Sequence, residues 1–331
     1  MRVDRFVLES PALRGNPLGD PSDREVVVVL PPGYDDDLRR LPALYLLAGF
    51  TGFGAAFLNR ACFDEAIDQR LARLFAQGCP PAIVVLPDCC TKYGGSQYVN
   101  STALGRYADH VVREIVPAID RRYRTLARAD GRALLGKSSG GFGALHLVMT
   151  HPGTFGAVAC HSGDLGFDLC YPPAFPTAAD VLGRTGGVTP FLEEFFRKPK
   201  RSAAEITAIE MIAMSAAYSP NTESESGFDL PFEIATCDAR PDVFARWLGF
   251  DPIRRVAARA AALRELKLLF VDCGARDEYH LHFGARRFVR ECRAHALTVD
   301  HEEFDDSHRA TSYRYDVSIP KIVRALARAS G

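Results

Sequence analysis

A serine flanked by glycines is the pattern in this chain that most directly indicates chemistry. The run Gly136-Lys137-Ser138-Ser139-Gly140 has the form G-x-S-x-G and lies between two apolar runs, 132–135 and 141–149. A strand, a sharp turn and a helix are the setting of a nucleophile elbow, which exposes a serine hydroxyl at the end of a strand. Glycine on both sides of the turn allows backbone segments to approach without a Cβ clash. We therefore predict Ser138 as a nucleophile; the alternative is a glycine-rich turn with a buried serine.

A nucleophilic serine needs a base, and His308 is placed to provide it. His308 follows the predicted strand 297–304, and open α/β sheets form their sites at the carboxyl ends of strands. The imidazole pKa lies near neutral pH, which suits a group that takes a proton from Ser138 and returns it to a leaving group. We predict His308 as this base; the alternative is a solvated loop histidine.

An acid is needed to orient the base, and Asp277 follows the predicted strand 266–272. The chain order is then serine, acid, histidine, as in α/β-hydrolases. Asp277 would hold the histidine tautomer and stabilise the imidazolium. Glu278 and Asp272 are the alternative acids. The remaining acids beside the histidine are predicted to form a turn: Asp305 and Asp306.

An oxyanion formed beside Ser138 needs two N–H donors. We predict that Ser139, directly after the nucleophile, provides one donor. The other should come from the loop after the predicted strand 41–47, where we choose Phe50, with Gly49 and Gly52 allowing the loop to approach the substrate. The alternative is an ordinary glycine turn.

Two further pairs of polar residues are candidates for binding. His161 and Asp164 follow a predicted core strand on the site side of the sheet, so we predict that they line the substrate pocket. His280 and His282 stand near Asp277, but an i, i+2 pair on a helix faces different directions, so we predict no metal site. The glycine-rich segments lack nucleotide-binding spacings, and no cofactor is predicted.

The elements that must position these residues alternate along the chain. Apolar runs predict strands at 3–10, 24–31, 41–47, 82–86, 132–135, 155–160, 266–272 and 297–304. Periodic segments predict helices at 62–77, 102–124 (with a kink at Pro117), 141–149, 280–296 and 312–329. The fold class is α/β, with one mainly parallel sheet covered by helices on both faces. Alternation stops at 165–260, which we predict to be an inserted cap with short helices at 191–197 and 203–217 within the single domain 1–331.

The composition restricts the partners. The 331 residues include 40 basic and 41 acidic side chains, so neither nucleic acid nor an anionic membrane surface is expected as a partner. No stretch is long and apolar enough to span a bilayer. The N-terminus lacks the apolar core of a signal peptide, and the nine cysteines have no C-x-x-C spacing, so we expect a cytoplasmic protein with reduced thiols. The sequence does not decide whether copies associate as a homo-oligomer.

At this point the chain resembles the esterase D-like "putative esterase" family of α/β-hydrolases, which includes S-formylglutathione hydrolases, feruloyl esterases, enterochelin esterase-like enzymes and mycolyltransferases. The resemblance covers about 7–164 and 265–325. It implies Ser138 as nucleophile, Asp277 as acid and His308 as base, with backbone donors at Phe50 and Ser139. Many members carry His-Gly where this chain has Ala48-Gly49, and 165–260 matches none of these subgroups. The motifs that carry the resemblance are 24–34, 42–49, 136–141, 273–277 and 307–308.

We therefore predict a serine esterase that hydrolyses a small-molecule carboxylic ester through an acyl-enzyme. Acyl transfer or thioester hydrolysis of the S-acyl-glutathione type on the same three residues is the alternative. A catalytically idle binding module is the alternative of another class. The acyl and alcohol parts of the substrate are not determined by the sequence.

Overall fold

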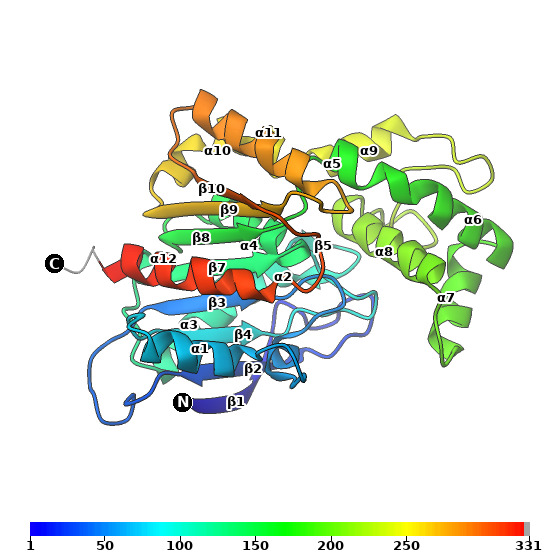
Figure 1. The fold of residues 1–331 in the computed structure, drawn as a ribbon. Helices are drawn as coiled ribbons and strands as arrows, with labels where there is room; N and C mark the ends of the chain where they lie inside the picture. The colour runs from blue at the N-terminus through cyan, green and yellow to red at the C-terminus, as the bar shows by residue number, and fades with distance from the viewer. Residues whose placement is uncertain (328–331) are drawn as a thin grey trace.

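The computed structural model describes residues 1–327, and its centre is an eight-stranded sheet between two layers of helices (Figure 1). The strand order is β1-β2-β4-β3-β7-β8-β9-β10. Strands from β4 to β10 in this order run parallel, whereas β1 and β2 are antiparallel to their neighbours. The strands are β1 (Arg2–Glu9), β2 (Asp23–Leu30), β3 (Ala43–Leu47), β4 (Ile83–Pro87), β7 (Arg132–Lys137), β8 (Ala157–His161), β9 (Leu268–Gly274) and β10 (Asp300–Phe304). A separate short hairpin pairs β5 (Asn100–Ser101) with β6 (Gly105–Arg106).

The central strands are apolar on both faces because helices cover both. In β3, Leu44 and Leu46 belong to the apolar cluster on one face, and Tyr45 and Leu47 belong to the cluster on the other. The first face is covered by α1 (Ile67–Ala76) and α12 (Tyr315–Ala327). On the second face lie α3 (Val116–Arg122), α4 (Ser139–Thr150), α10 (Pro252–Arg264) and α11 (Leu281–Ala294). The predicted α/β class with a mainly parallel sheet is therefore confirmed.

The helix predicted at 102–124 is shorter and irregular. Its first turn is α2 (Tyr107–Asp109), and a π-helical turn at His110–Ile115 leads into α3. Pro117 has no N–H and would clash with the carbonyl four residues earlier in a regular helix, and the wider π turn just before it avoids this conflict. Residues before 107 instead form the β5–β6 hairpin.

A group of helices between β8 and α10 projects beyond the sheet, at the right in Figure 1. We call residues 165–250 the helical segment. Its helices are α5 (Phe167–Cys170), α6 (Phe175–Thr185), α7 (Val188–Arg197), α8 (Ala203–Tyr218) and α9 (Pro241–Leu248). The next helix, α10, packs instead against α4 and α11 over the sheet, although most of it falls within the predicted insertion 165–260. With only Pro252, Val256 and Leu263 buried, its weak apolar periodicity does not mark it as a sheet-covering helix.

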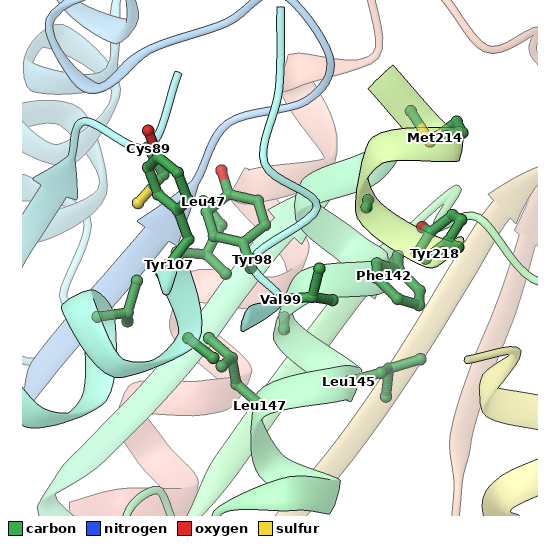
Figure 2. Close-up of a cluster of buried hydrophobic side chains, with 14 of the residues drawn as sticks. Leu47, Cys89, Tyr98, Val99, Tyr107, Phe142, Leu145, Leu147, Met214 and Tyr218 are labelled. Atoms are coloured by element: carbon green, nitrogen blue, oxygen red, sulfur yellow. The ribbon is translucent and has the colours of Figure 1, made fainter. Parts of the chain in front are cut away.

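The helical segment shares its core with the sheet. Figure 2 shows Met214 and Tyr218 of α8 beside Phe142 of α4, and the rings of Phe142 and Tyr218 lie 5.6 Å apart, edge to face. Met214, Tyr218 and Phe142 are all fully buried. This contact fixes α8 relative to the turn that carries Ser138, since α4 begins directly after that turn.

The other predicted elements differ at their ends. The helix predicted at 62–77 begins at Ile67, preceded by a 3₁₀ turn at Gly54–Leu58. Two further short 3₁₀ turns precede β7 and α6, at Ala129–Gly131 and Pro172–Ala174, and Ser312–Arg314 forms another before α12. The predicted end of the last helix, at 328–329, lies outside the described residues. Within residues 1–327, no helix is both apolar and long enough to cross a bilayer.

Candidate active site

Ser138 lies at a strained turn between β7 and α4. Its backbone has φ 57° and ψ −127°, a combination that non-glycine residues seldom adopt. A Cβ on Gly136 would clash with the backbone of Gly140, and a Cβ on Gly140 would clash with the carbonyl oxygen of Leu47 in β3. The two glycines are therefore required by close backbone approach, as the motif predicts.

The N–H groups predicted to stabilise an oxyanion belong to segments next to Ser138. Ser139 is the first residue of α4, so its N–H has no acceptor within the helix. The loop after β3 passes directly beside the serine, because a Cβ on Gly49 would lie 3.4 Å from Ser138 Cβ. Phe50 follows in this loop and lines the same cavity as Ser138. The structure thus brings both predicted donor residues to the serine.

Asp277 and His308 are in direct contact. His308 Nδ1 donates to Asp277 Oδ2 at 2.8 Å, which leaves Nε2 as the nitrogen that can act on a substrate. The other carboxylate oxygen, Oδ1, accepts the backbone N–H groups of Tyr279 at 2.9 Å and Leu281 at 3.4 Å. The two loops can meet because Gly274, at the end of β9, has no Cβ to clash with the carbonyls of Asp306 and Ser307.

The surroundings keep Asp277 ionised. Burial alone would raise its pKa, but the hydrogen bond from His308, its charge when protonated and the two backbone N–H groups hold the pKa of this carboxyl below its ordinary value. An anionic Asp277 is the form that fixes a proton on His308 Nδ1.

The alternative acids have other partners. Glu278 Oε2 accepts the backbone N–H of His308 at 2.8 Å and not its ring. Asp272 is fully buried and accepts from His161 Nδ1 at 2.7 Å and from Arg314 Nε at 2.8 Å. The two acids beside His308 make local or surface contacts: Asp306 accepts from the Ser307 N–H, and Asp305 pairs with Arg276.

Asp164 is the carboxylate nearest to the serine hydroxyl. Ser138 Oγ donates to Asp164 Oδ1 at 3.5 Å, a long and weak contact. Ser138 and His308 line the same cavity, but no hydrogen bond joins their side chains in the described part of the chain. Such contacts are often formed only when substrate is present. Asp164 Oδ2 accepts from Ser139 Oγ at 3.2 Å, Gln97 Nε2 at 3.3 Å and Tyr171 Oη at 3.1 Å.

A cavity of about 730 Å³ opens over Ser138. Its walls come from the loops after β3, β7, β8, β9 and β10 and from α8 and residues 170–177 of the helical segment. Apolar side chains of this lining include Phe50, Phe57, Ile206, Met211 and Leu281. The volume is large enough for a small organic molecule.

His161 is not part of the cavity lining. Both of its ring nitrogens are occupied, Nδ1 with Asp272 at 2.7 Å and Nε2 with Ser318 Oγ at 2.8 Å. Its side chain is buried on the face covered by α12, where its ring meets that of Tyr315. Of these two residues, which were predicted to line the pocket, the structure places only Asp164 there. His161 is the last residue of β8, and the chain turns at Ser162, where φ is 40°, before it reaches Asp164.

The other candidates for metal or thiol chemistry are His280, His282 and the nine cysteines. Among residues 1–327 no group of three His, Cys, Asp or Glu side chains is arranged to hold a metal ion. His280 lines the cavity, while His282 does not. All nine cysteines are free, and burial raises the pKa of several of their thiols, Cys89 and Cys160 included.

Several residues of the helical segment line the cavity without having been predicted, and two of them carry ionisable side chains near Asp164. Tyr171 bonds Asp164, and Glu210 of α8 lines the cavity. Glu210 is a single acid followed by a run of buried, mainly apolar residues, 211–218. An acid next to such a run is unusual, and this was the feature of the sequence that could have indicated a role for Glu210. The sequence of α8 does not show which group faces Glu210.

The chain belongs to the "Putative esterase" family, whose sequence model matches residues 21–298. The esterase Rv1288 of Mycobacterium tuberculosis (strain H37Rv) is 33% identical over 139 residues, which are 42% of this chain and 28% of that protein. YbbA of Bacillus subtilis (strain 168), an uncharacterised protein, is 24% identical over 157 residues, which are 44% of this chain and 59% of YbbA. The chain thus spans less than two thirds of the length of these curated relatives.

Solved structures share the fold over nearly the whole chain. A ferulic acid esterase superposes with a TM-score of 0.63 at 20% sequence identity, covering 98% of each chain. An S-formylglutathione hydrolase from Agrobacterium tumefaciens has a TM-score of 0.58 at 15% identity, covering 98% of this chain and 95% of the other. These similarities establish the α/β-hydrolase fold.

Proposed function

We propose that the protein is a serine hydrolase that cleaves a carboxylic ester through an acyl-enzyme, with Ser138 as nucleophile, His308 as base and Asp277 as acid. The observation that carries this proposal is the 2.8 Å hydrogen bond from His308 Nδ1 to Asp277, beside a cavity that His308 and Ser138 both line. Membership in an esterase family supports the reaction class.

In the first half of the proposed reaction, His308 Nε2 takes the proton of Ser138 as Oγ attacks the ester carbonyl carbon. The C–O bond to the alcohol then breaks, and the same proton passes from His308 to the alcohol oxygen. Water repeats the sequence on the acyl-enzyme, with His308 as its base, and releases the acid and free Ser138. Asp277 stabilises the imidazolium during both halves.

The negative charge on the carbonyl oxygen needs donors that are already in place. The Ser139 N–H at the start of α4 would be one of them, assisted by the positive end of the helix dipole. The Phe50 N–H in the loop beside Ser138 would be the other. The helical segment would act as a cap, since Tyr171 and α8 close one side of the cavity.

A panel of chromogenic acyl esters tests the proposal with wild type, Ser138→Ala and a labelling probe. We expect wild type to turn over at least one ester and to be labelled at Ser138 by a fluorophosphonate. Ser138→Ala should lose both properties while keeping its melting temperature within a few degrees. Equal hydrolysis by the two proteins, or no labelling of wild type, would refute the assignment of Ser138.

A further inference from the structure

We propose that the cavity over Ser138 selects esters that carry a protonated amine, and that Asp164 and Glu210 bind this group. The inference rests on the proposed esterase function and names a substrate class for the same site. It starts from two carboxyl groups in the cavity that the proposed reaction does not use.

Asp164 places a carboxylate next to the reacting atom. It is 7% exposed, and its Oδ1 lies 3.5 Å from Ser138 Oγ, so part of any ester bound to Ser138 must lie near it. Its other contacts are neutral donors, namely hydroxyl groups of Ser139 and Tyr171 and the amide of Gln97. Neutral donors compensate a buried negative charge less well than a cation does.

Glu210 has no partner at all within residues 1–327. It lines the cavity from α8, and no hydrogen bond or ion pair involves its carboxyl group. Burial, followed by the negative charge of Asp164, raises its pKa to about 7. The charge of Asp164 therefore reaches Glu210 within the cavity that both residues line.

Gln97 is a buried neighbour of Asp164 that does not itself line the cavity. The residue is 1% exposed, and its Nε2 donates to Asp164, but its Oε1 has no hydrogen-bond partner. An ammonium group brings one positive charge and three N–H donors. It would therefore suit the side of the cavity that Asp164 and Glu210 line.

The cations that line the cavity lie near other acids. Arg309 pairs with Glu278 at 3.5 Å. Burial lowers the pKa of Lys137, and among the charged groups Asp277 and Glu278 oppose this effect most strongly. Because both cations lie on the His308 side, the cavity has an acidic side toward the helical segment, and a cationic substrate group is expected to point there.

Matched esters test the proposal. The acyl series is the 4-methylumbelliferyl esters of 6-aminohexanoate, heptanoate and hemi-adipate, which have similar lengths and carry a positive, no and a negative charge. A second pair, the acetate esters of 6-aminohexanol and heptanol, places the amine in the alcohol part. We expect kcat/KM to be about tenfold higher for the amine than for the neutral ester in one of the two series, and lowest for hemi-adipate.

Glu210→Gln should reduce the ratio of amine to neutral kcat/KM by about tenfold. Glu193→Gln is the matched control, because Glu193 is an exposed acid of α7 on the same helical segment. It should leave the ratio unchanged. Melting temperatures and Ser138 labelling show that each variant is folded.

The outcomes separate the proposal from the function on which it rests. Hydrolysis of the neutral esters with Ser138 labelled, but with no amine preference in either series, overturns the amine site and leaves the esterase assignment standing. An amine preference that Glu210→Gln leaves unchanged also overturns the site. No hydrolysis and no labelling overturns both, whereas a preference that Glu210→Gln removes supports the proposal.

Discussion

Asp277→Asn is the change that tests the proposed catalytic arrangement most closely. The asparagine Oδ1 can still accept the N–H groups of Tyr279 and Leu281, so the loop after β9 should keep its shape. Its Nδ2 would replace the oxygen that lies 2.8 Å from His308 Nδ1. Since an amide nitrogen only donates, His308 Nδ1 must then accept, and the ring proton moves to Nε2.

A histidine with its proton on Nε2 cannot take the proton of Ser138. In enzymes in which an aspartate holds the catalytic histidine in this way, the corresponding change lowers kcat by about 10⁴-fold, or about 5 kcal/mol in activation free energy. We expect a loss of this size in kcat, measured with any ester that wild type hydrolyses, while melting temperature and fold remain close to wild type.

Glu278→Gln is the matched control. Glu278 accepts the backbone N–H of His308 and pairs at the surface with Arg309 at 3.5 Å, but it does not contact the His308 ring. A glutamine oxygen can still accept the backbone N–H, so the loss in kcat should stay below about tenfold. If Asp277→Asn keeps more than a tenth of the wild-type kcat, or if Glu278→Gln is the more damaged enzyme, the reasoning from tautomer and geometry is wrong.

Three other predictions concern stability. Gly140→Ala should destabilise by about 3 kcal/mol or more in urea unfolding, because the new Cβ clashes with the Leu47 carbonyl in β3; an unchanged midpoint would contradict this. Asp272→Asn should destabilise by about 3 kcal/mol, because the fully buried acid bonds His161 and Arg314, and its effect on kcat should be much smaller than that of Asp277→Asn. For Glu210, whose pKa burial raises from 4.5 to about 7, folding favours the protonated form, so wild type should lose stability as pH rises through that window. Glu210→Gln should lack this dependence on pH. The difference in unfolding free energy between the two proteins should therefore increase with pH, by less than about 3 kcal/mol; curves that stay parallel from about pH 5 to about pH 8 would contradict this.

The sequence by itself determined the fold class and the order of the residues proposed for catalysis. Buried parallel strands are apolar on both faces, so β3 and β4 are visible as continuous apolar runs. The turn at Ser138 is visible in the sequence because its G-x-S-x-G pattern lies between two apolar runs, although the contact that requires Gly140 is with Leu47 of β3. The positions of Asp277 and His308 at later strand ends follow from chain order and the parallel sheet, although their roles stay predictions.

Only the tertiary structure decided what surrounds the serine. His161 and Asp164 are three residues apart, yet one bonds Asp272 beneath α12 and the other lies against Ser138. β8 ends at His161, so the course of the loop that follows it, and not the distance along the chain, sets that difference. The placement of Glu210 in the same cavity as Asp164 depends on α8 packing against α4, a contact between segments far apart in sequence. No local sequence pattern predicts this contact, because an apolar face shows that a helix packs against something but does not show which element it packs against.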